Sequence, residues 1–139
     1  AIWKACSWMK IHASVNYSLQ YALDVTDPSS KNYRHQIPYT PRHCGSGNLI
    51  FETKWLNLSY RMTSSGKRYS KNQNIPANEI PSYADHSLSL NRTFTFGKVH
   101  EYNIHLSLEA LNLADNNYEI IHYYPMPGRS YRLTLKFKY

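Results

Sequence analysis

Large apolar and polar side chains alternate along six segments of the chain, and the alternation is strictest over its final residues, 131–139. The two alternating sets there are Tyr131, Leu133, Leu135, Phe137 and Tyr139, and Arg132, Thr134, Lys136 and Lys138. A β-strand repeats every two residues, so each set occupies one face. The same period predicts strands at residues 11–23, 48–55, 56–62, 87–96, 102–110 and 131–139. Helical spacing fits none of these segments.

The predicted strands are long, and the connections between them alternate in length. Strands of soluble proteins usually have about five or six residues, whereas a tilted strand that crosses a bilayer needs about nine to eleven. Polar connections at residues 24–46, 63–82 and 111–130 alternate with tight links near residues 54–57 and 97–100. Short turns at one end and longer loops at the other are typical of outer-membrane barrels. The sequence therefore predicts an all-β fold, an antiparallel meander of about six long strands that forms part of a transmembrane β-barrel.

The aromatic content agrees with this interpretation. The chain has 13 Tyr in 139 residues, and amphipathic rings are favoured where hydrocarbon meets water. Aromatic residues fall near both predicted strand ends, with Trp55, Phe94, Phe96, Phe137 and Tyr139 at the short-turn end and Tyr21 and Tyr131 at the long-loop end. A soluble β-sandwich or lipocalin-like ligand-binding module remains the alternative, and it requires a second layer over the apolar face.

Charge and motifs exclude several other classes. The net charge is +7, but the basic residues are spread along the chain and form no patch, so we predict no nucleic-acid partner. The sequence has no glycine-rich phosphate loop, nucleophile elbow or Cys-x-x-Cys motif, so we predict neither enzymatic activity nor a cofactor.

The cysteines and histidines predict neither a metal site nor a disulfide bond. His35, His43, Asp24, Asp27 and Cys44 share the first long connection and are acceptable zinc or copper ligands, but their spacing matches no ligand motif, so we predict no metal site. Cys6 and Cys44 fall at opposite ends of the first predicted strand, roughly 25 Å apart by the height of a barrel's apolar band, so we predict no bond between them.

Two motifs near the end of the chain resemble a known family. Asn112-Leu113-Ala114-Asp115-Asn116-Asn117-Tyr118 is followed by Pro127-Gly128-Arg129-Ser130-Tyr131. Together they resemble the C-terminus of TonB-dependent outer-membrane receptors, in which Asn-Leu-Phe-Asp-x-x-Tyr ends the penultimate strand and Pro-Gly-Arg-x-Tyr opens the last one. Ala114 stands where the family has an aromatic residue. Upstream, Gly66-Lys67-Arg68-Tyr69 and Ile80-Pro81-Ser82-Tyr83 resemble the family's pattern before its third-last strand.

The resemblance implies that residues 1–139 are the C-terminal part of a receptor barrel, without the plug and most of the family's roughly 22 strands. Six strands cannot close a transmembrane barrel, because about eight is the smallest number found. The implied location is the outer membrane of a Gram-negative bacterium, and the implied role is import of a siderophore, haem, cobalamin or glycan. The implied partners are the rest of the barrel and plug, the TonB complex acting through that plug, lipopolysaccharide and outer-membrane lipid.

The same interpretation assigns three groups of residues. The family motif comprises Asn112, Leu113, Asp115, Tyr118, Pro127, Gly128 and Arg129. The terminal strand, with Tyr131, Leu133, Leu135, Phe137 and Tyr139, resembles the signal that the barrel-assembly machinery recognises. Loop position and side-chain type predict ligand contacts from Tyr33, Arg34, His35, Tyr39, Arg42, Tyr123, Tyr124 and Met126.

Overall fold

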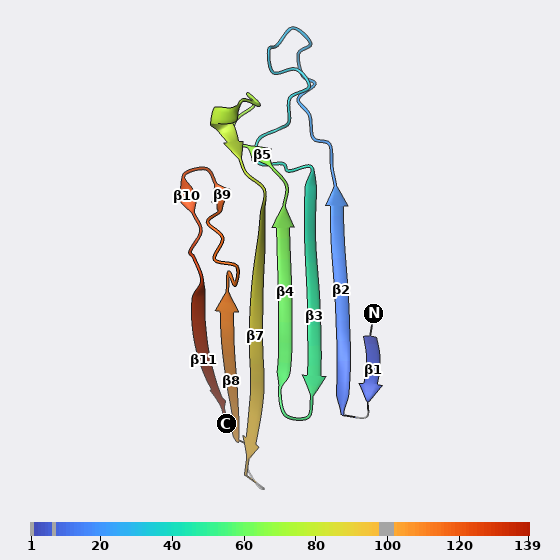
Figure 1. Cartoon of the computed structure of the whole chain (residues 1–139), viewed down its shortest axis with the longest axis vertical. Helices are drawn as coiled ribbons and strands as arrows, with labels where there is room; N and C mark the ends of the chain where they lie inside the picture. Colours follow the sequence, from blue (N-terminus) through green and yellow to red (C-terminus); the bar gives the residue numbers. More distant parts are fainter. Residues whose placement is uncertain (1, 7, 98–101) are drawn as a thin grey trace.

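A single antiparallel sheet of seven strands dominates the computed structural model, which describes residues 2–6, 8–97 and 102–139. The strands are β1 (Ile2–Cys6), β2 (Met9–Leu19), β3 (His43–Thr53), β4 (Asn57–Ser65), β7 (Tyr83–Phe96), β8 (Tyr102–Leu111) and β11 (Ser130–Lys138). Their order in the sheet follows their order in the chain, so the sheet is an up-and-down meander (Figure 1). The predicted all-β antiparallel fold is confirmed, with β1 as an additional strand.

The small elements lie at the end of the sheet that carries the long loops (Figure 1). β5 (Arg68–Tyr69) pairs with β6 (Glu79–Ile80), and the short 3-10 helix η1 (Pro76–Asn78) lies between them in sequence. β9 (Glu119–Ile121) pairs with β10 (Tyr124–Pro125). No helix within the described residues is long and apolar enough to cross a membrane.

The strand boundaries differ from the predicted ones mainly at the long-loop end. β2 ends at Leu19, and Leu23 forms only an isolated bridge with Gln36. β3 begins at His43, five residues before the predicted strand at 48–55, and so includes Gly45 and Gly47, although glycine is disfavoured in strands. Gly45 lies opposite Tyr17 and Gly47 opposite Val15, so pairing with β2 overrides local propensity. β7 begins at Tyr83, and most of the predicted turn at 97–100 lies outside the described residues.

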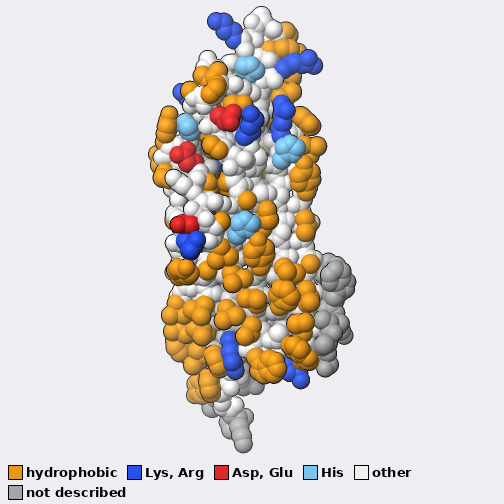
Figure 2. Space-filling model, in the orientation of Figure 1, with side chains coloured by type: hydrophobic (Ala, Val, Ile, Leu, Met, Phe, Trp, Pro, Cys, Tyr) orange, Lys and Arg blue, Asp and Glu red, His pale blue; other side chains and the backbone are white. Residues whose placement is uncertain are grey.

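The register of the sheet aligns apolar residues into continuous rows across neighbouring strands. One row contains Ile11, Phe51, Leu58, Leu90, Leu108 and Leu133. The next row on the same side contains Ala13, Leu49, Tyr60, Leu88, Ala110 and Tyr131. We call this side the apolar face. In Figure 2, apolar side chains gather over the part of the sheet away from the long loops, and most charged side chains lie at the loop end.

The opposite side, which we call the polar face, has almost no apolar residues. One of its rows contains Lys10, Glu52, Asn57, Asn91, Ser107 and Thr134. Another contains His12, Ile50, Ser59, Ser89, Glu109 and Arg132, and an ion pair joins its last two members. The sheet therefore separates its side chains by polarity across all the long strands.

The described part of the chain has no hydrophobic core in the usual sense. Ile80 is its only buried apolar residue, and it lies in the loop region rather than under the sheet. The chain exposes 10261 Å², whereas a compact monomer of 16.3 kDa exposes about 7,500 Å². The excess arises because the sheet is a single layer whose apolar face is not covered by other described residues.

The cysteines lie at opposite ends of the sheet, as predicted. Cys6 pairs with Met9 at the short-turn end, and Cys44 pairs with Ser18 near the long loops. The strand rise separates these positions by about 30 Å, and Cys44 is a free thiol.

The register can be tested by cross-linking. In a chain with both native cysteines changed to Ser, we expect Ser59→Cys with Ser89→Cys to form a disulfide, because these residues are directly opposite on the polar face. Ser59→Cys with Leu90→Cys should not cross-link, because Leu90 lies on the apolar face. Mass spectrometry after thiol alkylation distinguishes the two outcomes, and cross-linking of the second pair alone would contradict the register.

Candidate ligand-binding site at the long-loop end

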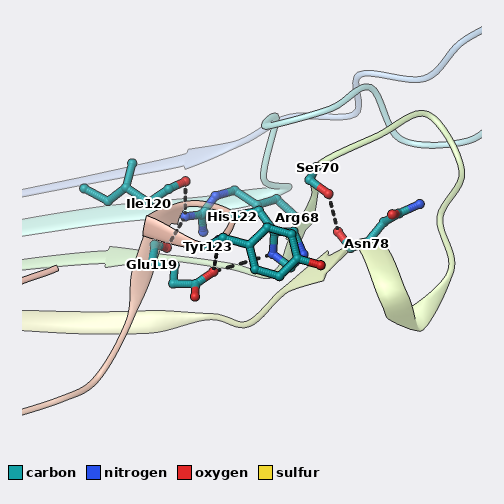
Figure 3. A network of polar contacts seen from close by, with 7 residues as sticks. All are labelled: Arg68, Ser70, Asn78, Glu119, Ile120, His122 and Tyr123. Atoms are coloured by element: carbon teal, nitrogen blue, oxygen red, sulfur yellow. Dashed lines mark hydrogen bonds and ion pairs between the residues drawn. The ribbon is translucent and has the colours of Figure 1, made fainter. Parts of the chain in front are cut away.

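The three long loops, at residues 20–42, 66–82 and 112–129, meet around Arg68. Its side chain is 3% exposed, and Nη2 donates hydrogen bonds to the carbonyl oxygens of Glu119 (2.6 Å) and Ile120 (2.9 Å; Figure 3). The first loop joins the second through Tyr39 N–H, which donates to Tyr69 O at 2.8 Å. These contacts link all three loops into one assembly, which we call the loop cap.

Contacts within the second loop hold Arg68 in place. Arg68 pairs with Ile80, whose side chain is fully buried. Ser70 donates from its backbone N–H and its hydroxyl to Asn78 O, at 2.8 and 3.3 Å (Figure 3). At the start of the loop, a Cβ on Gly66 would lie 3.2 Å from His43 O. Because glycine has no Cβ, the backbone of Gly66 can approach His43 closely at the point where the second loop begins.

Arg68 lies against an aromatic stack. Its Cζ is 5.5 Å from the centroid of the Tyr83 ring, and Tyr83 stacks on Tyr118 with centroids 4.3 Å apart. A guanidinium over an aromatic face is attracted by the ring quadrupole. Within the described residues, Nη1 of Arg68 is buried without a hydrogen-bond partner, and none of the ion pairs involves Arg68.

A depression of about 450 Å³ opens on the loop cap. It is lined by Tyr39, Arg68, Ile120 and Ile121, which come from all three loops. Small-molecule sites usually measure about 300–1,000 Å³ and combine an apolar lining with a few polar groups. The depression has that size and that composition.

Of the ligand contacts predicted in the first loop, only Tyr39 lines this depression. Tyr33 and Arg34 donate their backbone N–H groups to Ser30 and Asp24 within their own loop, and Arg42 lies 5.3 Å over the ring of Tyr21. His35 contacts the second loop through Nδ1, 3.1 Å from Asn72 O. The structure therefore does not gather these residues around one cavity.

None of the ligand contacts predicted in the third loop lines the depression. Tyr123 is 79% exposed, and its backbone N–H donates to a carboxylate oxygen of Glu119 at 2.9 Å (Figure 3). Tyr124 is 70% exposed, and Met126 N–H donates to Tyr118 O. The depression is lined instead by Arg68, Ile120 and Ile121, together with Tyr39. Sequence reasoning missed the first three as site residues, although the upstream motif contains Arg68 and an apolar pair in a polar loop is an unusual feature.

The family-motif residues form a clamp between the end of β8 and the start of β11. Asn112 is 4% exposed, and Nδ2 donates to the carbonyl oxygens of Asn116 (2.9 Å) and Pro127 (3.1 Å). Asn112 Oδ1 accepts from Asn116 N–H at 3.0 Å. Asp115 Oδ1 accepts from Arg129 N–H at 2.8 Å, and a Cβ on Gly128 would lie 3.0 Å from that oxygen. Leu113 N–H donates to His86 O, so the clamp also reaches β7.

The terminal strand, β11, is an edge of the sheet. It pairs with β8 along its whole length, and no other described strand pairs with its second edge. Tyr131, Leu133, Leu135, Phe137 and Tyr139 are all more than half exposed on the apolar face. An unpaired strand edge of this kind is a template for another strand.

The described residues contain no group of three His, Cys, Asp or Glu side chains that could hold a metal ion. His43 Nδ1 lies 2.7 Å from the hydroxyl of Tyr17, while His35 contacts Asn72. Asp24 and Asp27 accept hydrogen bonds from Thr26 and Ser29, which lower the pKa of each carboxyl. These acidic residues organise turns of the first loop.

Burial raises the pKa of Tyr118 to about 12, and the negative charge of Asp85 adds to the effect. The phenol is therefore neutral throughout the physiological range.

Comparison with models of known protein families gave no match, and comparison with curated protein sequences gave none either.

The clamp predicts a large effect of removing the Asn112 amide. Asn112→Ala leaves Pro127 O and the Asn116 backbone without their partner, and it places a residue other than Asn at φ 48°. We expect the free energy of unfolding to fall by about 1–3 kcal/mol. Denaturant unfolding checks this, with exposed Asn117→Ala as the matched control, and equal effects of the two changes would contradict the assigned role of the clamp.

Titration of Tyr118 gives a second test. The unfolded chain ionises this phenol near its ordinary pKa of 10.0, while the folded chain retains the proton to about 12. The folded state therefore loses stability as pH rises across that interval. The absorbance difference between the parent protein and Tyr118→Phe should titrate near pH 12, and Asp85→Asn should lower that midpoint. A midpoint near 10 in the parent protein would contradict the burial of Tyr118.

Proposed function

We propose that this chain is a wall segment of a TonB-dependent outer-membrane receptor. In this proposal the apolar face contacts lipid, the polar face lines the lumen and the long loops lie at the outer surface. The complete receptor would import a scarce nutrient such as a siderophore, haem, cobalamin or glycan. The loops would capture the ligand, and the TonB complex would act on the plug. The resemblance of the two terminal motifs to the family supplies the transport role.

The observation that carries the proposal is the pair of chemically opposite faces on a single-layer sheet. The row from Ile11 to Leu133 runs over six strands without a polar residue. A shallow apolar groove of about 390 Å³ crosses this face between Leu88, Leu90, Leu108 and Leu133. Such a surface is costly in water but matches acyl chains.

The polar groups on the apolar face are satisfied in ways that suit a lipid environment. The hydroxyl of Tyr17 lies 2.7 Å from His43 Nδ1, and that of Tyr60 lies 2.6 Å from His86 Nδ1. Hydrocarbon offers no hydrogen bonds, so polar atoms there need protein partners. Arg92 interrupts the apolar pattern, and its Cζ lies 4.6 Å from the centroid of the Phe94 ring. In a lipid environment, the long side chain of an arginine can extend its charged end toward the interface.

The aromatic residues support the same orientation. Trp55, Phe96 and Phe137 are all more than half exposed at the short-turn end, and the rings of Trp8 and Trp55 are 6.0 Å apart. Tyr21 and Tyr131 are exposed toward the long loops. Two aromatic belts around an apolar band are typical of outer-membrane barrels.

The soluble sandwich or lipocalin-like module is the weaker proposal. Either architecture needs a second layer or a closed barrel to cover the apolar face, and the described residues supply neither. A receptor wall needs only lipid on that face and further strands along the two edges of the sheet.

Placing a charge on each face separates the two proposals. Leu90→Lys puts an ammonium group on the apolar face, while Ser89→Lys puts it on the polar face of the same strand. Near the middle of a bilayer, the first change should cost about 2–4 kcal/mol of folding free energy and leave membrane location intact. Ser89→Lys should have little effect. Urea titration of the folded, unheated electrophoretic band in outer-membrane fractions measures both.

The parent protein must first appear in that fraction as a band whose mobility changes on heating. Recovery of a soluble 16.3 kDa chain from the source cells would sink the receptor proposal and favour an independent β-domain.

A further inference from the structure

We propose that the strand adjoining the free edge of β11 carries two acidic residues separated by one apolar residue, and that its carboxylates lie opposite Lys136 and Lys138. The inference rests on the proposed receptor function, in which further strands complete the wall. It deepens that function by assigning the chemistry of one of those strands, which runs antiparallel to β11 as every other pair in the sheet does.

The first argument is the uneven charge of β11 on the polar face. Arg132 has an acidic partner on β8, because it forms an ion pair with Glu109. Lys136 and Lys138 instead lie opposite a histidine and an asparagine of β8. Both lysines are exposed, and neither takes part in an ion pair within the described residues. Carboxylates on the other side of β11 would supply the missing charge, since opposite charges stabilise directly facing residues of a sheet.

The second argument is the apolar face of the same strand. Leu133, Leu135 and Phe137 each have an apolar partner on β8, yet they are 60%, 52% and 71% exposed. Phe137 stands between the two lysines in sequence and therefore points to the opposite face. A strand that continues the apolar rows must place an apolar residue opposite Phe137 and polar residues on either side of it. With carboxylates as the polar residues, both faces of β11 are matched.

The third argument excludes a second copy of this chain as the neighbour. The opposite edge of the sheet is formed by β1 and β2, which contain no Asp or Glu, so it offers the lysines no carboxylate (Figure 1). Two copies of β11 would bring only cations and a threonine together on the polar face. Like charges facing one another destabilise a sheet, and lysines on an edge strand discourage self-association. The charge therefore favours a strand from another part of the receptor wall.

The test uses the complete gene product in outer-membrane fractions. Carbodiimide joins a lysine amine to a carboxylate in contact with it, and the pair of Lys67 and Glu79, with 3.4 Å between Nζ and Oε2, is the internal control. We expect mass spectrometry to find Lys136 or Lys138 joined to an Asp or Glu of a strand outside residues 1–139. Lys136→Arg with Lys138→Arg keeps the charge but removes the reactive amines, so the joined peptides should fall at least tenfold.

Charge exchange gives an independent measurement. Lys136→Glu with Lys138→Glu should lower the urea midpoint of the folded, unheated band by roughly 0.5 M, because like charges would then face each other across the strand pair. Changing the coupled acidic residues to Lys in the same chain should restore that midpoint. The matched control is Lys31→Glu with Lys71→Glu, two exposed lysines of the long loops, and it should leave the midpoint unchanged.

Several results would overturn the inference. These are absence of coupling at both lysines of β11 while the control pair couples, coupling to a segment without alternating apolar residues, and a charge exchange that fails to restore the midpoint. Coupling found only between labelled and unlabelled copies in an isotopically mixed sample would assign the edge to a second copy instead. Each result leaves the receptor proposal standing if the band keeps its heat-dependent mobility. Loss of that behaviour in the parent protein overturns the receptor proposal itself.

Discussion

The hydrogen-bonded ladder of the antiparallel sheet is the constraint on which the rest of this structure depends. Side chains alternate between faces with a period of two, so a slip of one residue between any two strands would exchange the faces of one of them. The observed register keeps Leu58, Leu90 and Leu108 in one row and Ser59, Ser89 and Glu109 in the adjacent row on the other face. A sheet with one apolar and one polar face requires this coherence over every strand.

The loop cap depends on a different balance of forces. It contains Ile80, the one buried apolar residue of the described chain, and also the buried cation Arg68. Arg68 joins the second loop to the third through backbone carbonyl oxygens, and Tyr39 joins the first loop to the second. Polar contacts between loops therefore organise the cap, whereas backbone pairing between strands organises the sheet.

The motifs that resemble the receptor family have a structural explanation in this chain. Asn112 and Asp115 both adopt positive φ, and their side chains bind the backbone just before β11. The clamp fixes the start of the edge strand against the end of β8. Ala114 is exposed, so the absence of the family's aromatic residue leaves the hydrogen bonds of the clamp intact.

The sequence by itself determined the strands, their alternating faces and the division into short turns and long loops, because a period of two can be identified from neighbouring residues alone. It did not determine that Gly45 and Gly47 lie in a strand, since pairing with β2 decides this. It named Tyr39 as a ligand contact but not Arg68, Ile120 or Ile121 beside it. Residues 39, 68 and 120 belong to three separate loops, and only tertiary folding brings them together, because no local pattern encodes contacts between distant segments of a chain.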